Sequence, residues 1–292
     1  MLSMEIIRKI KSIHIKSSRL VNTMMAGQYK SVFRGSGIEF EEVREYSPGD
    51  DVKSIDWKVS ARMGRPFVKL YREERELVLM LMVDMSASTF FGTTLHTKKE
   101  IAAEVAGILA FNAIRNNDRV GAILFTDQVE RYIPPKKGAA HIWRVIKEIF
   151  TFEPGRKRTD INSAVRYLGH VCRKKTVSFL ISDFLCVDFL HGMKIAANKH
   201  DLIAVMLSDP GDFTLPSAGL VTVEDFETGK TVLLDASGRN TRQLFEQRQR
   251  TRYRALLEQL KSADIDCVEI STDAAVSEAL VKFFRYRSKR NH

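Results

Sequence analysis

Apolar runs alternate with helix-like patterns along the chain from Leu77 onward. The apolar runs have the length of strands and lie at 77–83, 119–125, 176–182, 201–207 and 266–270. Between and after them, apolar residues recur at helical spacing in the segments 98–114, 139–150, 161–172, 189–199 and 274–285. Strands that alternate with helices are typical of a parallel sheet, and strands without a polar face indicate a sheet covered on both sides. We therefore predict an α/β fold with a doubly wound, mainly parallel sheet and helices on both faces.

Two segments interrupt this alternation before the last strand. Two short apolar runs flank Gly229 within 221–235, which predicts a β-hairpin, and 240–261 has the charge density of a long exposed helix. We interpret 211–262 as an insertion in a sheet domain that spans 77–292.

Residues 1–76 form a separate charged prefix in this interpretation. A helix is predicted up to about Met25, followed by a glycine-containing loop at 34–38 and a turn in the sequence SPGDD. Apolar residues of the helix recur at helical spacing among basic ones, which is typical of a helix that packs on protein or, less often, lies on an anionic membrane. The dense charges at 42–66 indicate either an ion-pair network that attaches the prefix to the sheet domain or a second recognition surface.

The composition of the 292 residues is that of a globular protein, with 44% hydrophobic and 9% aromatic residues. The apolar runs are far shorter than the roughly 20 residues that span a bilayer, and no signal-peptide pattern begins the sequence, so we expect a cytoplasmic protein. Three cysteines at long spacings, Cys172, Cys186 and Cys267, indicate neither a disulfide framework nor a zinc site.

The net charge of +10 is concentrated in basic stretches at 1–37, 239–254 and 282–290. Such stretches are usually solvated faces, although they also favour acidic partners such as nucleic acid, lipid or protein. In 239–254 the arginines spread over several faces of the predicted helix, and no helix-turn-helix or RNA-recognition motif is present. Nucleic-acid binding is therefore an alternative and not the expected function.

The sequence LMLMVDMSAST at 79–89 places Asp84, Ser86 and Ser88 at the end of a predicted core strand. Ligands of a doubly wound sheet bind outside the carboxyl ends of its strands. One carboxylate and two hydroxyls at alternate positions form an oxygen-only set that suits a hard cation such as Mg²⁺. The same residue types also cap helices and form turns, so these three residues alone leave a structural role open.

Two later strand–helix junctions bring further oxygen groups to the same edge. Thr159 precedes the helix predicted at 161–172, and Asp183 follows the strand predicted at 176–182. The combination of DxSxS, a later Thr-Asp and a later Ser-Asp resembles the metal-ion-dependent adhesion site of von Willebrand factor A domains. By this resemblance Ser86, Ser88 and Thr159 hold the metal, and Asp84 and Asp183 bind it through water or accept hydrogen bonds from its ligands. It also implies that an acidic residue of a partner protein fills an open coordination position.

Longer stretches resemble a bacterial family known as domain of unknown function fifty-eight. They lie, in order, at 35–88, 115–138, 182–185, 200–221 and 225–230, and the resemblance covers about 28–285. It implies partnership with MoxR-type AAA+ ATPases in the assembly or maturation of other proteins. One departure is the run Gly-Arg-Lys-Arg at 155–158, where the family pattern usually has glycine. Its cations should weaken metal binding and strengthen attraction to an acidic partner, so we expect Mg²⁺, or else Mn²⁺ or Ca²⁺, to be held weakly without a partner.

An enzymatic role is the remaining alternative, because Mg²⁺ with two aspartates also serves phosphoryl transfer and hydrolysis. The sequence has no phosphate-binding loop, dinucleotide-binding glycine motif, HExxH or GxSxG, and its histidines are scattered without ligand spacing. We therefore predict a non-catalytic protein-binding module, with a magnesium-dependent hydrolase as the weaker alternative.

Overall fold

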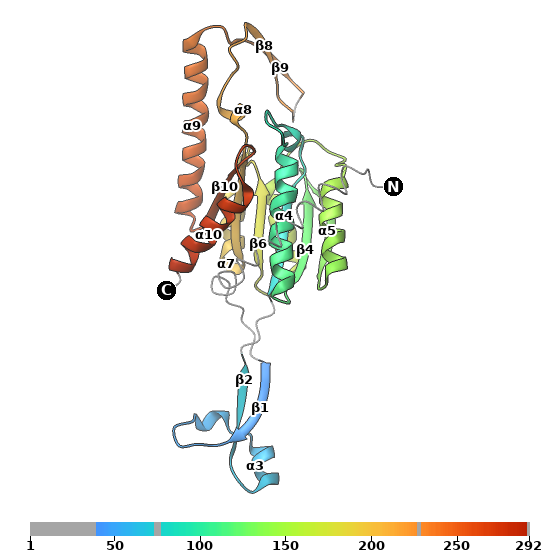
Figure 1. Cartoon of the computed structure of the whole chain (residues 1–292), viewed down its shortest axis with the longest axis vertical. Coiled ribbons are helices and arrows are strands. Elements are labelled where there is room, and N and C mark those ends of the chain that lie inside the picture. The colour runs from blue at the N-terminus through green and yellow to red at the C-terminus, as the bar shows by residue number, and fades with distance from the viewer. Residues whose placement is uncertain (1–38, 73–76, 227–228, 291–292) are drawn as a thin grey trace. The chain divides into compact units, whose positions relative to one another are not determined.

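The computed structural model describes residues 39–72, 77–226 and 229–290. The chain divides into two compact units, one between residues 33 and 77 and the other containing everything from Val78 onward (Figure 1). The helix predicted up to about Met25 and the loop at 34–38 lie outside the described residues.

A six-stranded sheet is the centre of the larger unit. Its strands are β3 (Val78–Asp84), β4 (Arg119–Phe125), β5 (Val129–Lys136), β6 (Val177–Ser182), β7 (Asp201–Ser208) and β10 (Asp266–Ser271). They pair in the order β10-β7-β6-β3-β4-β5, and every pair is parallel except β4 with β5. The structure therefore confirms the predicted α/β fold with a mainly parallel sheet.

The antiparallel edge strand β5 is not among the predicted strands. Its sequence, VERYIPPK, contains two prolines and has a mixed burial pattern instead of a continuous apolar run. Proline cannot donate a ladder hydrogen bond, and it is tolerated in a strand only at a sheet edge or a bulge. β5 satisfies both conditions, because it pairs with β4 alone and its register shifts twice along the pair.

Helices cover both faces of the sheet, as the apolar strands predict. Met80 and Met82 of β3 belong to a core that also contains residues of α6 (Ile161–Val171), α7 (Leu190–Lys199) and α9 (Arg239–Ser262). On the other face, α4 (Lys98–Arg115) packs on β3 and contacts α5 (Ala139–Thr151) and α10 (Val276–Arg290) (Figure 1). The sheet is thus buried on both sides, and the side chains at 79–85 have at most 1% of their surface exposed.

The segment between β7 and β10 contains the hairpin and the long helix. It begins with the short helix α8 (Pro210–Phe213), continues into the antiparallel pair β8 (Leu220–Glu224) and β9 (Thr231–Asp235), and ends with α9. Gly229 takes a φ of +67°, a conformation that a turn between two strands often requires and that glycine adopts without strain. Among the described residues, no helix combines the length and the apolar character that crossing a membrane requires.

The smaller unit consists of a strand pair and two short helices. β1 (Glu39–Glu45) is antiparallel to β2 (Phe67–Arg72), and between them lie the 3-10 helix η2 (Val52–Ser54) and α3 (Trp57–Met63). Three ion pairs lie within this unit: Arg44 with Asp50 at 2.7 Å, Arg65 with Glu45 at 3.3 Å and Lys69 with Asp56 at 3.5 Å. Part of the charge at 42–66 therefore stabilises this unit itself.

The strand order places a topological switch point between β3 and β6. The strands that follow β3 directly, β4 and β5, add on one side of it, whereas β6, β7 and β10 add on the other. Loops that leave neighbouring strands in opposite directions open a crevice at the carboxyl ends, where ligands of open α/β sheets bind. The ends of β3 and β6 carry Asp84 and Asp183, two of the predicted site residues.

Candidate metal-binding site

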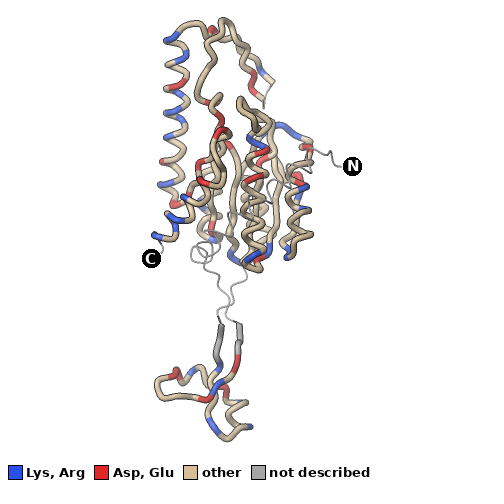
Figure 2. Tube along the Cα trace, viewed as in Figure 1, with Lys and Arg blue, Asp and Glu red and all other residues tan. Residues whose placement is uncertain are grey.

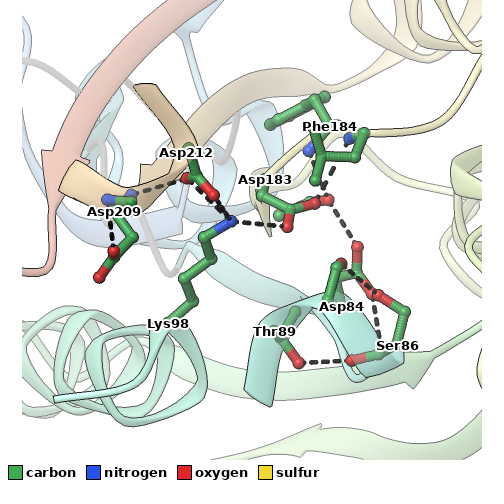
Figure 3. Close-up of polar contacts among 12 residues, drawn as sticks. Asp84, Ser86, Thr89, Lys98, Asp183, Phe184, Asp209 and Asp212 are labelled. Carbon is green, nitrogen blue, oxygen red and sulfur yellow. Dashed lines mark hydrogen bonds and ion pairs between the residues drawn. The ribbon is translucent and has the colours of Figure 1, made fainter. Parts of the chain in front are cut away.

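Asp84 is held by both strands that meet at the switch point. One carboxylate oxygen accepts a hydrogen bond from the backbone N–H of Ser86 at 2.9 Å, and the other accepts one from the Ser182 hydroxyl, at the end of β6, at 2.6 Å (Figure 3). The side chain is buried, and burial together with the nearby charge of Asp183 raises its pKa to about 7. A cation beside Asp84 would therefore relieve an unfavourable buried charge.

The two serines after Asp84 bring their hydroxyls together. Ser86 and Ser88 are buried, and their Oγ atoms lie 3.2 Å apart. Ser86 occupies the N-cap position of the 3-10 helix η3 (Ala87–Phe90), but its side chain makes no capping hydrogen bond. The structure therefore provides no capping role for the Ser86 hydroxyl. The turn-forming role that the sequence left open is taken by the Asp84 carboxylate, which accepts the N–H of Ser86 two residues later.

The loop that carries Thr159 is hydrogen-bonded to the serine loop. The backbone N–H of Ala87, which lies between the two serines, donates to the carbonyl of Lys157 at 2.9 Å. Thr159 follows Lys157 by two residues in the same loop. The neighbouring Asp160 caps α6 through the N–H of Asn162 at 2.9 Å. Within the described part of the chain, the buried Thr159 Oγ1 has no hydrogen-bond partner.

Asp183 is paired with a cation that belongs to the protein itself. The Lys98 ammonium lies 3.1 Å from Asp183 and 2.9 Å from Asp212 (Figure 3). Burial by itself would lower the pKa of Lys98, but the two carboxylates outweigh it and raise the pKa. Burial also raises the pKa of Asp212, and Lys98 opposes that effect. Lys98 thus remains charged in the interior and neutralises part of the acidic cluster.

A tight turn after β7 positions Asp212. The backbone N–H of Asp209 donates to Asp212 at 2.7 Å, and Asp209 accepts hydrogen bonds from Gly211 N–H at 2.8 Å and from the Thr272 hydroxyl at 2.5 Å. The hydroxyl of Thr93 also contacts Asp209. The turn is therefore fixed to the segments after β3 and β10, which keeps Asp212 beside Lys98.

The predicted site lacks several residues of this network, among them Lys98, Ser182 and Asp212. A signal for Lys98 exists in the sequence, because TKKE at 97–100 forms a capping box that places Lys98 at the first position of α4. A cation there opposes the helix dipole and therefore needs a compensating partner. Ser182 and Asp212 follow the strand-end rule that identified Asp183, since they lie at or just after the ends of β6 and β7.

The five predicted residues thus come from three loops at one edge of the sheet, around the switch point. Their donor atoms are all oxygens, with hydroxyls outnumbering carboxylates, which suits a hard cation that keeps several waters. Across the ranges that the structure describes, no group of three or more histidine, cysteine, aspartate or glutamate side chains could hold a metal ion. The buried, unpartnered Thr159 hydroxyl is the feature that fits a metal ligand here.

The strand order, with β4 and β5 on one side of β3 and β6, β7 and β10 on the other, defines the larger unit as a doubly wound α/β domain with a mainly parallel sheet. The model of the family described as "Protein of unknown function DUF58" matches residues 42–255, and the chain belongs to this family.

The chain is similar to a curated protein and to two solved structures of lower identity. Uncharacterized protein Rv1480 of Mycobacterium tuberculosis is 30% identical over 223 residues, which cover 75% of this chain and 70% of that protein. Among solved structures, the conserved hypothetical protein BatB from Bacteroides thetaiotaomicron is 13% identical with a TM-score of 0.47, covering 73% of this chain and 99% of that one. The SpRpn10 VWA domain is 12% identical with a TM-score of 0.41, covering 70% and 94%. Both TM-scores lie below 0.5, so the fold assignment rests on the strand order itself.

Proposed function

We propose that this chain is a non-catalytic protein-binding module whose site at the ends of β3 and β6 binds a divalent cation and an acidic side chain of a partner protein. Ser86, Ser88 and Thr159 would hold the cation, and Asp84 and Asp183 would bind it through water or accept hydrogen bonds from its ligands. Mg²⁺ is the natural occupant, with Mn²⁺ or Ca²⁺ as substitutes. When bound, the cation supplies a positive centre for the partner's carboxylate.

The observation that carries this proposal is the buried Thr159 hydroxyl, which has no hydrogen-bond partner among the residues described. A buried polar group left in that state costs about 1–3 kcal/mol, so its retention needs a reason. A metal ligand is such a reason, and the Ser86 and Ser88 hydroxyls 3.2 Å apart provide the same chemistry on the adjoining loop.

The surroundings of the site favour binding over chemistry. Cys186 follows Asp183 by three residues, and burial, with smaller contributions from Asp84 and Asp183, raises the pKa of its thiol to about 12. The thiolate is therefore scarce at neutral pH, and Cys186 is a poor nucleophile. Asp183 already has a partner within the protein, because Lys98 lies 3.1 Å from its carboxylate.

Exposed cations near Thr159 fit an acidic partner. Lys157 and Arg158 are exposed, and Arg156 is held 3.2 Å from Asp127. Positive charge at the rim accelerates association with an acidic surface and disfavours other partners. By family resemblance, we propose a MoxR-type AAA+ ATPase as the partner, with this chain as its accessory in protein assembly or maturation.

The test is a biosensor measurement of association between this chain and a MoxR-type ATPase from the same genome, in Mg²⁺ and in EDTA. We expect binding that requires Mg²⁺ and is lost in Thr159→Ala but kept in Thr159→Ser. Thr151→Ala, at the end of α5, is the matched control and should bind like the wild type. Binding that ignores both EDTA and Thr159→Ala would contradict the metal site, and absence of binding would contradict the ATPase as partner.

A further inference from the structure

The smaller unit presents a tryptophan to solvent on one side of α3. Trp57 is the first residue of this helix, and 69% of its surface is exposed. Lys58, Ala61 and Arg62 are also exposed, and they follow Trp57 by one, four and five residues, which places all four on one side of the helix. We call these four residues the basic α3 face.

The opposite side of α3 packs on β2, which settles the orientation of the helix. The Ser60 hydroxyl accepts a hydrogen bond from Phe67 N–H at 2.8 Å and donates to the carbonyl of Asp56 at 2.7 Å. The N–H of Asp56 in turn donates to the Phe67 carbonyl at 2.8 Å. Val59, next to Ser60, is half-buried. The basic α3 face therefore lies on the side away from β2, on a helix whose start is fixed by hydrogen bonds.

The carboxylate closest to this face in sequence is already engaged. One oxygen of Asp56 caps α3 by accepting the N–H groups of Lys58 and Val59 at 3.0 and 3.2 Å, and the other lies 3.5 Å from the Lys69 ammonium. Lys58 and Arg62 take no part in the three ion pairs of this unit. The positive charges of these two side chains are therefore available to an acidic group of another molecule.

The charge of the whole unit favours a protein partner over nucleic acid or a membrane. Residues 39–72 contain seven Lys or Arg and seven Asp or Glu, and Figure 2 shows both signs of charge distributed over the unit. Phosphate backbones and anionic bilayers attract proteins through an extended positive field, which a neutral unit does not provide. Two cations beside an exposed ring instead suit a local match with acidic side chains at the rim of a protein interface.

The residue types of the basic α3 face are those that contribute most to protein–protein binding. Tryptophan and arginine are enriched among the residues that carry most of the binding energy at interfaces. A tryptophan ring supplies a large apolar contact area with only two rotatable side-chain bonds to immobilise. Trp57 leaves most of that area in contact with water, so a pocket that enclosed the ring would gain the full hydrophobic contribution.

We infer that the basic α3 face is a second docking surface for the partner protein, which receives Trp57 in an apolar pocket and places acidic side chains against Lys58 and Arg62. The inference rests on the proposed function for the identity of the partner but not for the metal site. It also assigns a role to charges at 42–66 that the three ion pairs of the unit do not use.

The experiment measures association of the full chain with the immobilised MoxR-type ATPase, in Mg²⁺ and in EDTA, with association and dissociation rates recorded separately. Trp57→Ala should weaken binding at least about tenfold, mainly through faster dissociation, because the ring leaves the contact. Trp57→Phe keeps a ring and should lose less. The double variant Lys58→Glu and Arg62→Glu should slow association and reduce its dependence on salt.

Matched controls change the same properties elsewhere on the chain. Tyr286→Ala removes a ring that is 62% exposed on α10, in the larger unit, and should bind like the wild type. Lys147→Glu with Lys194→Glu, at exposed positions of α5 and α7, repeats the change in net charge and should leave the association rate closer to that of the wild type. A fluorescein-labelled single-stranded DNA oligonucleotide tests nucleic acid as the occupant, and circular dichroism confirms that each variant is folded.

The outcomes separate this inference from the metal site. Binding that needs Mg²⁺ but is unchanged by Trp57→Ala and by the double variant would overturn the inference and keep the metal site. Binding that needs Trp57 but persists in EDTA would support the inference and contradict the metal site. Oligonucleotide binding that is lost in Trp57→Ala would overturn the inference and assign the face to nucleic acid. No association with the ATPase in either buffer would overturn the inference together with the ATPase as partner.

Discussion

Replacing Lys98 with methionine should strongly destabilise the larger unit. The ammonium lies 3.1 Å from Asp183 and 2.9 Å from Asp212, and the Lys98 and Asp183 side chains are each only 1% exposed. Removing one partner of a buried ion pair leaves an uncompensated charge and typically costs about 3–5 kcal/mol. Asp212 is 22% exposed and keeps some hydration, so we expect a loss of about 3–4 kcal/mol in the free energy of unfolding.

The pH dependence of this effect has a definite sign. The raised pKa of Lys98 keeps its contribution fully present below the ordinary value of 10.5, and the contribution disappears only as the pH rises through the raised value. Lys98→Met should therefore have a lower free energy of unfolding than the wild type throughout the neutral pH range. The loss of stability should shrink at acidic pH, because Asp212, whose pKa burial raises, can take up a proton once its cationic partner is gone.

Urea unfolding in EDTA, followed by tryptophan fluorescence, measures the effect. The chain has two tryptophans, Trp57 in the smaller unit and Trp143 in the larger one, so a Trp57→Phe background makes the signal report the larger unit. Lys147→Met, on the exposed face of α5, is the matched control and should change the unfolding free energy by less than about 0.5 kcal/mol. A loss below about 1 kcal/mol for Lys98→Met would refute the role assigned to the buried ammonium.

Three further predictions concern the residues around Asp84. The pKa of Asp84 is raised from 3.8 to about 7, so Asp84 binds its proton more tightly in the folded state than in the unfolded state. In EDTA the free energy of unfolding should therefore fall as the pH rises from about 4 to 7. Urea titrations at several pH values should show that Asp84→Asn lacks this fall. Ser182→Ala removes the donor to Asp84 and the acceptor for Phe184 N–H, and it should lose about 1–3 kcal/mol in the same assay. Thr159→Ala, which removes an unpartnered hydroxyl, should not destabilise the protein in EDTA, as thermal unfolding would show.

The sequence was sufficient to predict the parts of the fold that depend on periodicity. β3, β6 and β7 are continuous apolar runs, and a sheet buried on both faces is the arrangement that accommodates such runs. β5 was missed because an edge strand with prolines has no such pattern. β5 can be recognised only from its pairing with the free edge of β4, and the strand order is needed to know that this edge is free.

The candidate site was predictable to the extent that it follows from strand ends. The carboxyl ends of parallel strands share one edge, so Asp84 and Asp183 could be placed together without a structure. Lys98 could not be assigned in this way, because its partners lie 85 and 114 residues further along the chain. The absence of a partner for the Thr159 hydroxyl among the described residues is likewise a property of packing, which no local pattern reveals.

The most direct test of the central claim is a calorimetric titration of the purified chain with Mn²⁺, a substitute for Mg²⁺, using the wild type, Thr159→Ser and Thr159→Ala. We expect the wild type and Thr159→Ser each to bind one ion weakly when no partner is present, and Thr159→Ala to bind it at least about tenfold more weakly still because an oxygen ligand is lost. Equal Mn²⁺ affinity in Thr159→Ala and the wild type, or no binding by the wild type, would contradict the assignment of this site to a metal.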